Sequence, residues 1–185
     1  MALADGLVGD SSAGGRPGVA PRFTRVSDAD GVPERVALGV SEMLTERPDA
    51  HVCVVVRRSK DAKPLAEALA DLLPEHDVRH GHNASFQFDP GATVTNMRQI
   101  KGLEFDAVFV VEPSEANYSS GDGQAEQGRK WLYTVLTRAK DRLELIGLEP
   151  LTGLLSDSVE HGRLEVADEG AVPEVVCGDE DDEPF

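Results

Sequence analysis

The sequence lacks the features that would place the protein in a membrane or in an oxidising compartment. No apolar run approaches the roughly 20 residues that a membrane-spanning helix requires. The first 21 residues have no basic start followed by a long apolar stretch, which argues against a secretory signal. The two cysteines, Cys53 and Cys177, lie far apart and form no Cys-x-x-Cys pair, which argues against a disulfide framework and a zinc site. We therefore expect a cytoplasmic protein that makes no membrane contact.

The sequence is also short of positive charge. Its formal net charge is −16, which at first sight opposes binding to nucleic acid. Much of this excess is local, because residues 160–185 hold ten acidic side chains and a single basic one, Arg163. Acidic terminal segments of this kind are usually solvated and disordered. The rest of the chain is only mildly acidic, so any contact with nucleic acid has to be local.

The composition predicts one folded domain between two tails. Apolar residues make up 40% of the 185 positions, which is enough for the core of a single domain. Residues 1–21 are rich in Gly, Ala and Ser, and we expect them to be disordered. The folded domain is predicted to span residues 22–158. Residues 159–185 are predicted to form an acidic, largely disordered tail.

Alternating strands and helices predict the fold class. Residues 52–56 and 107–111 are apolar throughout, as is typical of strands buried on both faces. The full predicted order is strand 22–26, helix 33–44, strand 52–56, helix 61–73, strands 77–80, 92–96 and 107–111, helix 127–140 and strand 143–146. This order predicts an α/β fold whose parallel β-sheet is sandwiched by helices. Ligands of such sheets gather at the carboxyl ends of the strands.

Two segments carry polar side chains in patterns that suit a ligand site. Residues 95–106 read Thr-Asn-Met-Arg-Gln-Ile-Lys-Gly-Leu-Glu-Phe-Asp and run directly into an apolar strand. Residues 131–143 read Trp-Leu-Tyr-Thr-Val-Leu-Thr-Arg-Ala-Lys-Asp-Arg-Leu and place Arg138 between a helix and a strand. Each segment alone also has an ordinary interpretation. The first would be a strand connection with a solvated lysine, and the second a surface arginine at a helix C-terminus.

Taken together, these segments resemble motifs V and VI of the UvrD, PcrA and Rep helicases of superfamily 1. The upstream segment Val54-Val55-Val56-Arg57, continuing to residues 65–69, is similar to motif IV of the same family. The resemblance covers roughly residues 50–147 and keeps the family's motif order. It implies the second RecA-like domain of such a helicase, a P-loop NTPase-like fold without a P-loop of its own.

The resemblance also implies roles for individual residues. Arg57 and Arg138 would be catalytic arginine fingers that reach the γ-phosphate of ATP, a contribution of about 10³–10⁵ in rate. Gly102 and Glu104 would lie at the ATP, with Glu104 as an acceptor for the ribose hydroxyl. Contacts with single-stranded DNA would come from Asn96, Arg98, Gln99 and Lys101. The family usually has Thr and His where this chain has Asn96 and Arg98.

The sequence contains no Gly-x-x-x-x-Gly-Lys-[Ser/Thr] segment that would cradle phosphates. We therefore expect ATP and Mg²⁺ only when a first RecA-like domain, in trans or upstream, completes the site, and no ATP hydrolysis by the isolated chain. Residues 108–112 end in an acid, as magnesium-binding strands do, but without the loop we interpret them as a core strand. His80 and His82 have no third ligand at suitable spacing, so no metal site is predicted.

Three functional hypotheses follow. In the first, the chain is the C-terminal motor domain of a UvrD-like ATP-dependent DNA helicase, with a first RecA-like domain and single-stranded DNA as partners. In the second, it is a stand-alone, non-catalytic module that binds nucleic acid or protein, as in the helicase-like proteins that act on RNA polymerase. In the third, it is a decayed remnant with no surviving function. The presence of two candidate finger arginines together with Glu104 favours the first. Phe86, Phe88 and Tyr118 are candidates for stacking on bases. Phe86-Gln87-Phe88 alternates like a short strand with one buried face, which is the preferred interpretation of the two phenylalanines, and Trp131 is interpreted as packing.

Overall fold

The computed structural model describes residues 20–82, 86–121 and 123–168. Within these ranges, seven strands form one sheet in the order β3-β4-β2-β5-β6-β1-β7, and all neighbouring strands run parallel. The predicted α/β fold with a parallel sheet is confirmed. Residues 1–19 and 169–185, which hold most of the two predicted tails, lie outside the described residues.

The elements follow the predicted order closely. The strands are β1 Arg22–Arg25, β2 His51–Val56, β3 Val78–His80, β4 Gly91–Asn96, β5 Phe105–Val111, β6 Ala139–Gly147 and β7 Glu165–Asp168. The helices are α2 Gly31–Glu46, α3 Ser59–Leu72, α4 Ala125–Leu136 and α5 Ser156–Glu160, with a 3-10 turn η2 at Gly153–Leu155. No helix in the described part of the chain is long and apolar enough to cross a membrane.

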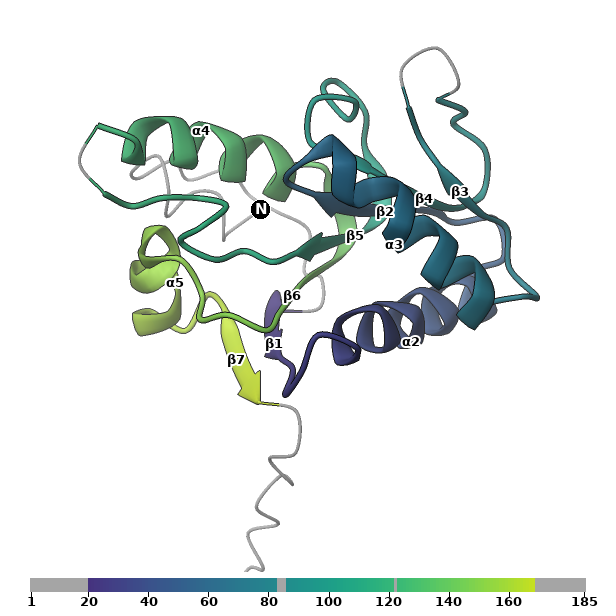
Figure 1. Ribbon diagram of the computed structural model, residues 1–185, viewed down its shortest axis with the longest axis horizontal. Coiled ribbons are helices and arrows are strands. Elements are labelled where there is room, and N and C mark those ends of the chain that lie inside the picture. The colour runs from purple at the N-terminus through teal and green to yellow at the C-terminus, as the bar shows by residue number, and fades with distance from the viewer. Residues whose placement is uncertain (1–19, 83–85, 122, 169–185) are drawn as a thin grey trace, which may run out of the picture.

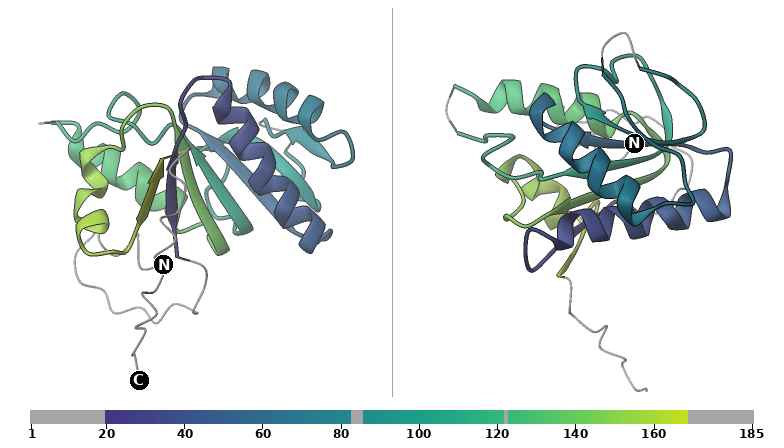
Figure 2. Two further views of the ribbon diagram at one scale, coloured as in Figure 1. Left: turned by 90° about the horizontal axis from the view of Figure 1, so that it is seen from below. Right: turned by 45° about the vertical axis from the view of Figure 1, so that its right-hand side comes forward.

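The sheet is covered on both faces, by α2 and α3 on one side and by α4 and α5 on the other (Figure 1, Figure 2). Strand β2 explains why both faces need a cover. Its side chains alternate between the faces. Val52, Val54 and Val56 enter the core under α2 and α3, and Cys53 and Val55 enter the core under α4. The strand is apolar at both sets of positions, so it is stable only between two layers of helices.

The connection from β4 to β5 crosses strand β2 without a helix. Residues 97–104 form this crossing segment, which starts where β4 ends and finishes where β5 begins. Met97 and Ile100 are buried and join the core on the α4 side of the sheet. The segment therefore takes the place of a crossover helix and runs from the carboxyl edge of the sheet to its amino edge.

Two predicted boundaries are corrected. The helix expected to reach residue 140 ends at Leu136, because strand β6 already begins at Ala139 and the carbonyl of the preceding Arg138 accepts a hydrogen bond from the N–H of Phe105 at 2.8 Å. The folded domain also continues beyond residue 158. Residues 165–168 form β7, which pairs with β1 at the edge of the sheet. Only residues 169–185 of the predicted tail lie outside the described ranges.

Candidate functional site

The structure divides the predicted site residues between two opposite edges of the sheet. Arg57 directly follows β2, and Asn96 ends β4 in register with Val56, so both lie at the carboxyl edge. Glu104 and Arg138 directly precede the paired residues Phe105 and Ala139, so both lie at the amino edge. Since the strands are parallel, the backbones of Arg57 and Arg138 emerge at opposite ends of the sheet. The structure does not bring the two expected arginine fingers together at one pocket.

At the amino edge, the Arg138 side chain is held by three hydrogen bonds. Its Nε donates to the carbonyl of Thr134 at 3.0 Å and its Nη2 to the hydroxyl of Thr137 at 3.1 Å. Its Nη1 donates to the carbonyl of Leu103 at 3.2 Å. These bonds tie the end of α4 to the crossing segment. A guanidinium has five N–H donors, so the group is fixed in place with two donors left over.

Gly102 and Glu104 lie beside this arginine, on either side of Leu103. Gly102 is exposed and has a φ of 84°, a conformation that glycine adopts without strain. Glu104 is exposed, and its carboxylate forms no hydrogen bond or ion pair with another described residue. The next acid along the chain, Asp106, is different, because it accepts a hydrogen bond from the backbone N–H of His51 at 2.8 Å and pairs with Arg47 at 2.8 Å. Of the two acids, only Glu104 is available to a ligand.

The four residues predicted to contact DNA differ in how accessible their side chains are. Asn96 is almost fully buried, and its amide is occupied: Nδ2 donates to the Ser59 hydroxyl at 3.0 Å, and Oδ1 accepts from the backbone N–H of Arg98 at 2.9 Å. Its role is to fix the end of β4 against the start of α3. Arg98 is exposed at the carboxyl edge, while Gln99 is half-buried and Lys101 is exposed further along the crossing segment.

At the carboxyl edge, Arg57 stacks on an aromatic ring. Its guanidinium lies 3.5 Å from the ring centre of Trp131, and its Nε donates to the carbonyl of Asn117 at 3.1 Å. Burial lowers the pKa of Arg57, and the nearby charges of Arg98 and Arg58 lower it further. These three arginines form a concentrated positive patch, which we call the arginine patch.

Tyr118 adds no negative charge to this patch. The side chain of Tyr118 is fully buried close to Arg57, and burial raises the pKa of its hydroxyl to about 12. It is therefore neutral at physiological pH. Full burial also removes Tyr118 from the candidates for base stacking. Phe88, in contrast, is 45% exposed and stacks on His51 with ring centres 4.5 Å apart.

A hollow of about 580 Å³ opens beside the arginine patch. Its floor is one face of α4, since Gln124, Gln127, Gly128 and Trp131 follow helical spacing. Its rim comes from the end of β2 and the loop after β5, and the rim residues are Arg57, Arg58, Glu115, Ala116, Asn117, Ser119 and Gly123. The sequence interpretation assigned Trp131 to packing, and Trp131 does pack against the core on the α4 side, but the sequence interpretation did not foresee this hollow. The helical spacing of the two glutamines and Trp131 was the available signal.

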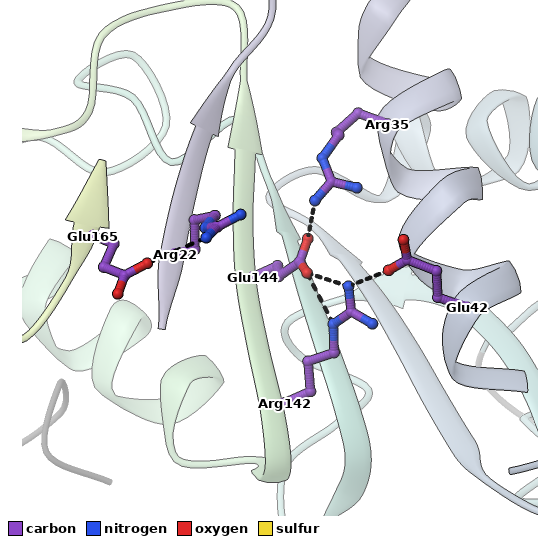
Figure 3. A network of polar contacts seen from close by, with 6 residues as sticks. All are labelled: Arg22, Arg35, Glu42, Arg142, Glu144 and Glu165. Atoms are coloured by element: carbon purple, nitrogen blue, oxygen red, sulfur yellow. Dashed lines mark hydrogen bonds and ion pairs between the residues drawn. The ribbon is translucent and has the colours of Figure 1, made fainter. Parts of the chain in front are cut away.

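A second hollow of about 570 Å³, between α2 and β6, holds mutually paired charges. Glu144 accepts from Arg35 Nη2 at 3.1 Å and from Arg142 Nε at 2.8 Å (Figure 3). Arg142 also bonds Glu42 at 2.8 Å. Because the charges compensate one another, we interpret this hollow as a structural link between helix and sheet.

Glu112, the acid that ends β5, is part of the scaffold. It has a φ of 53°, its Oε1 accepts from the backbone N–H of Leu148 at 2.8 Å, and its carbonyl accepts from Asn117 Nδ2 at 3.0 Å. The rings of His80 and His82 lie 5.7 Å apart. No group of three or more His, Cys, Asp or Glu side chains suited to a metal occurs among the residues that the structure describes.

Comparison with known proteins bears on the fold and on the segment from β4 to β6. Residues 91–146, which contain the crossing segment and Arg138, match the family model of the UvrD-like helicase C-terminal domain. The fold is similar to the C-terminal domain of a possible DNA helicase from Lactobacillus plantarum WCFS1. The two are 25% identical, the match covers 90% of this chain and 95% of the other, and the TM-score is 0.69. No curated protein sequence matches the chain.

More distant structures are less similar in sequence and in fold. The large terminase ATPase domain of Thermus phage P74-26 is 12% identical with a TM-score of 0.48, and the match covers 82% of this chain and 76% of the other. A likeness this remote carries no argument about function. The matched segment, the two helicase-type motifs and the fold agree with one another. Residues 91–146 are similar to the UvrD-like helicase C-terminal domain, and they lie within an α/β RecA-like parallel sheet that helices cover on both faces.

Proposed function

We propose that the chain is the C-terminal motor domain of a UvrD-like ATP-dependent DNA helicase. In this proposal its amino edge faces ATP held by a first RecA-like domain, and its carboxyl edge faces single-stranded DNA. The observation that carries the proposal is the fixed Arg138 guanidinium beside Gly102 and Glu104, all within the segment that matches the helicase family. The proposal keeps Arg138 as an arginine finger and moves Arg57 to the nucleic-acid edge.

The amino edge has the groups that a nucleotide held by another domain needs. The two unused donors of Arg138 are available to the γ-phosphate, where a guanidinium offsets the charge that develops during phosphoryl transfer. Because the other three donors already hold the side chain in place, little reorganisation is needed when the two domains close. Glu104 offers a free carboxylate to the ribose hydroxyls. ATP supplies the phosphoryl group, and it and Mg²⁺ would be held by the partner domain, because this sequence has no phosphate-binding loop.

The carboxyl edge suits the phosphates of a single strand. The arginine patch of Arg57, Arg58 and Arg98 concentrates positive charge in an otherwise acidic protein. Contacts of this kind position a strand without reading its sequence. For a single strand, the logarithm of the binding constant falls linearly with the logarithm of the salt concentration. Each arginine that contacts a phosphate is expected to make this slope steeper by roughly 0.7.

The test is ATP turnover by this chain together with a first RecA-like domain that carries a phosphate-binding loop, in the presence of saturating single-stranded DNA. We expect Arg138→Ala to lower turnover by about 10³-fold or more, because the finger is lost. Arg129→Ala is the matched control, since Arg129 is exposed on α4 next to the same motif and is expected to have no effect.

Arg57→Ala separates the two edges. We expect it to raise the DNA concentration needed for stimulation and to leave turnover at saturating DNA nearly unchanged. If Arg57→Ala abolished turnover at saturating DNA while Arg138→Ala did not, the assignment of the edges would be reversed. If the complete assembly bound DNA but never hydrolysed ATP, the chain would be a binding module instead.

A further inference from the structure

Three groups hold the guanidinium of Arg138, and only one of them belongs to a side chain. The carbonyls of Thr134 and Leu103 are backbone groups, whereas the third acceptor is the hydroxyl of Thr137. We infer that Thr137 is a positioning residue for the arginine finger: its hydroxyl keeps the Arg138 guanidinium in the orientation from which the two unused donors reach the γ-phosphate. This inference rests on the proposed function and gives a role to a residue outside the predicted site residues.

The hydroxyl of Thr137 is oriented so that it accepts from Arg138. Its single proton is donated to the backbone of α4, where the oxygen lies 2.8 Å from the carbonyl oxygen of Tyr133 and 3.2 Å from that of Thr134. The lone pairs of the hydroxyl are then left for an outside donor, and Nη2 of Arg138 lies 3.1 Å away. Because a guanidinium can only donate, the helix turns this hydroxyl in the way that the arginine requires.

The three acceptors restrain the guanidinium from two directions. Nε and Nη2 bond to the end of α4, and Nη1 bonds to the crossing segment at Leu103. Each terminal nitrogen carries two N–H groups, so one donor stays unused on Nη1 and one on Nη2. A guanidinium binds a phosphate most strongly when two donors act together, which depends on how its plane is turned. Loss of the Thr137 hydroxyl would leave Nη2 without a partner among the described residues, and the plane would be held less tightly.

Thr137 also ends α4, and this structural role has to be separated from positioning. It is the residue that follows the helix, and its bond to Tyr133 is of the same kind as the bond from the Thr134 hydroxyl to the carbonyl of Lys130 at 2.8 Å. Thr134→Val removes such a helix bond and leaves the backbone bond to Arg138 in place. It is therefore the matched control for stability, and we expect Thr134→Val and Thr137→Val to unfold at similar urea concentrations.

The first measurement uses this chain alone. Nitrogen NMR records the exchange between the Nη1 and Nη2 signals of Arg138, which are assigned by their loss in Arg138→Ala. Exchange requires rotation of the guanidinium about the Nε–Cζ bond. We expect it to be several-fold faster in Thr137→Val than in the original protein, and unchanged in Thr134→Val. Equal exchange in Thr137→Val and the original protein would overturn the inference.

The second measurement is the single-turnover rate of ATP hydrolysis by the complete assembly with a first RecA-like domain and saturating single-stranded DNA. We expect Thr137→Val to lower this rate by about 10- to 100-fold, as for a lost hydrogen bond to a charged group or a misplaced catalytic group. The affinity for ATP should change little, because the partner domain holds the nucleotide. Thr137→Ser, which keeps the hydroxyl, should restore most of the rate. An unchanged rate in Thr137→Val would contradict the positioning role.

A double variant shows whether Thr137 acts through the finger. If it does, Thr137→Val lowers the rate no further once Arg138→Ala is present, because the effects of residues that act through one contact are not additive. A further loss of the same size in the Arg138→Ala background would mean that Thr137 acts independently of the finger, and the inference would be wrong.

The same measurements keep this inference apart from the proposed function. Loss of turnover in Arg138→Ala with an unchanged rate in Thr137→Val would leave the proposed function standing and overturn positioning alone. An assembly that hydrolyses no ATP, or whose hydrolysis survives Arg138→Ala, would overturn the proposed function and with it the finger that Thr137 positions.

Discussion

At the scale of single residues, the backbone at Gly102 restricts which side chains this position accepts. Its φ of 84° lies in the left-handed region, and a Cβ added there would meet no atom within 4 Å. We expect Gly102→Ala to destabilise the fold by about 1–2 kcal/mol, the cost of the left-handed conformation for a residue with a side chain. The measurement is urea unfolding. Gly121→Ala is the control, since Gly121 needs no positive φ and has room for a Cβ, so we expect little change there.

Glu115 gives the protein a dependence on acidic pH. Burial would raise the pKa of its carboxyl, but hydrogen bonds from Ser120, Gly153 and Thr152 outweigh this effect and lower the pKa to about 2. A depressed pKa stabilises the folded state above the unfolded pKa of about 4.5. That stability is lost as the pH falls towards 2. We expect Glu115→Gln to remove part of the loss of stability on acidification, measured by thermal unfolding at a series of pH values. An identical pH profile for both proteins would contradict this role.

The helicase-type segments were readable from the sequence, but the environment of their residues was not. The Lys-Gly-Leu-Glu and Thr-Arg-Ala segments are local patterns, and the family match over residues 91–146 agrees with them. Arg57 follows strand β2, and Arg138 precedes strand β6, which runs in the same direction. The order of residues and strands therefore implied that the two arginines lie at opposite edges of the sheet. In contrast, the amide of Asn96 is occupied by Ser59, 37 positions earlier, and no local pattern reports such a contact.

At the scale of elements, a cluster of largely buried charged side chains attaches α2 to β6. The side chains of Glu144, Arg35 and Arg142 are 9%, 13% and 21% exposed (Figure 3). We expect Glu144→Ala to lower the free energy of unfolding by about 3–5 kcal/mol, because it leaves the largely buried guanidinium of Arg35 without a carboxylate and that of Arg142 with Glu42 alone. The measurement is equilibrium unfolding in urea.

The pair Arg22–Glu165 is the control for this prediction. It joins β1 to β7, and both side chains are about half exposed, at 51% and 55% (Figure 3). Surface pairs of this kind contribute at most about 1 kcal/mol, so Glu165→Ala is expected to have a small effect. Equal effects of the two substitutions would show that burial of the Glu144 cluster is not what makes it stabilising.

The elements themselves were predictable to different degrees. Strands β2 and β5 were predictable because they are apolar at both alternating sets of positions, as burial on two faces requires. Strand β7 was not predictable. Its four residues are mostly exposed and two of them are acidic, and the strand exists because β1 offers it an open edge. Helix α4 ends earlier than predicted because the carbonyl of residue 138 is hydrogen-bonded to β5. This contact joins residues far apart in the sequence, and no local pattern reports it.

At the scale of the whole molecule, the excess negative charge opposes the proposed DNA edge. Residues 169–185 alone carry seven acidic side chains and no basic one. We expect a chain shortened to residue 168 to bind single-stranded DNA several-fold more tightly at low salt, because repulsion of the strand is reduced. The difference should largely disappear at about 1 M salt, where charges are screened beyond roughly 3 Å. Fluorescence anisotropy of a labelled strand over a salt series measures both.

A full-length variant separates charge from chain length. In it, the seven acidic residues of 169–185 are replaced by their amides, which keeps the size of each side chain. This variant is expected to bind as tightly as the shortened chain. If it bound like the original protein, the gain on shortening would come from removing the segment's bulk, and electrostatic repulsion would be excluded as the cause.

The crossing segment of residues 97–104 gives the two edges a mechanical relation. It is anchored at one end where Asn96 is pinned to α3, and at the other where Arg138 grips the carbonyl of Leu103. Between these anchors it has buried side chains at Met97 and Ile100 and no helix that could lengthen or uncoil. A short segment fixed at both ends has little room to change its length. In the proposed function, a displacement of the strand-binding edge would therefore also shift the carbonyl of Leu103 that holds Arg138.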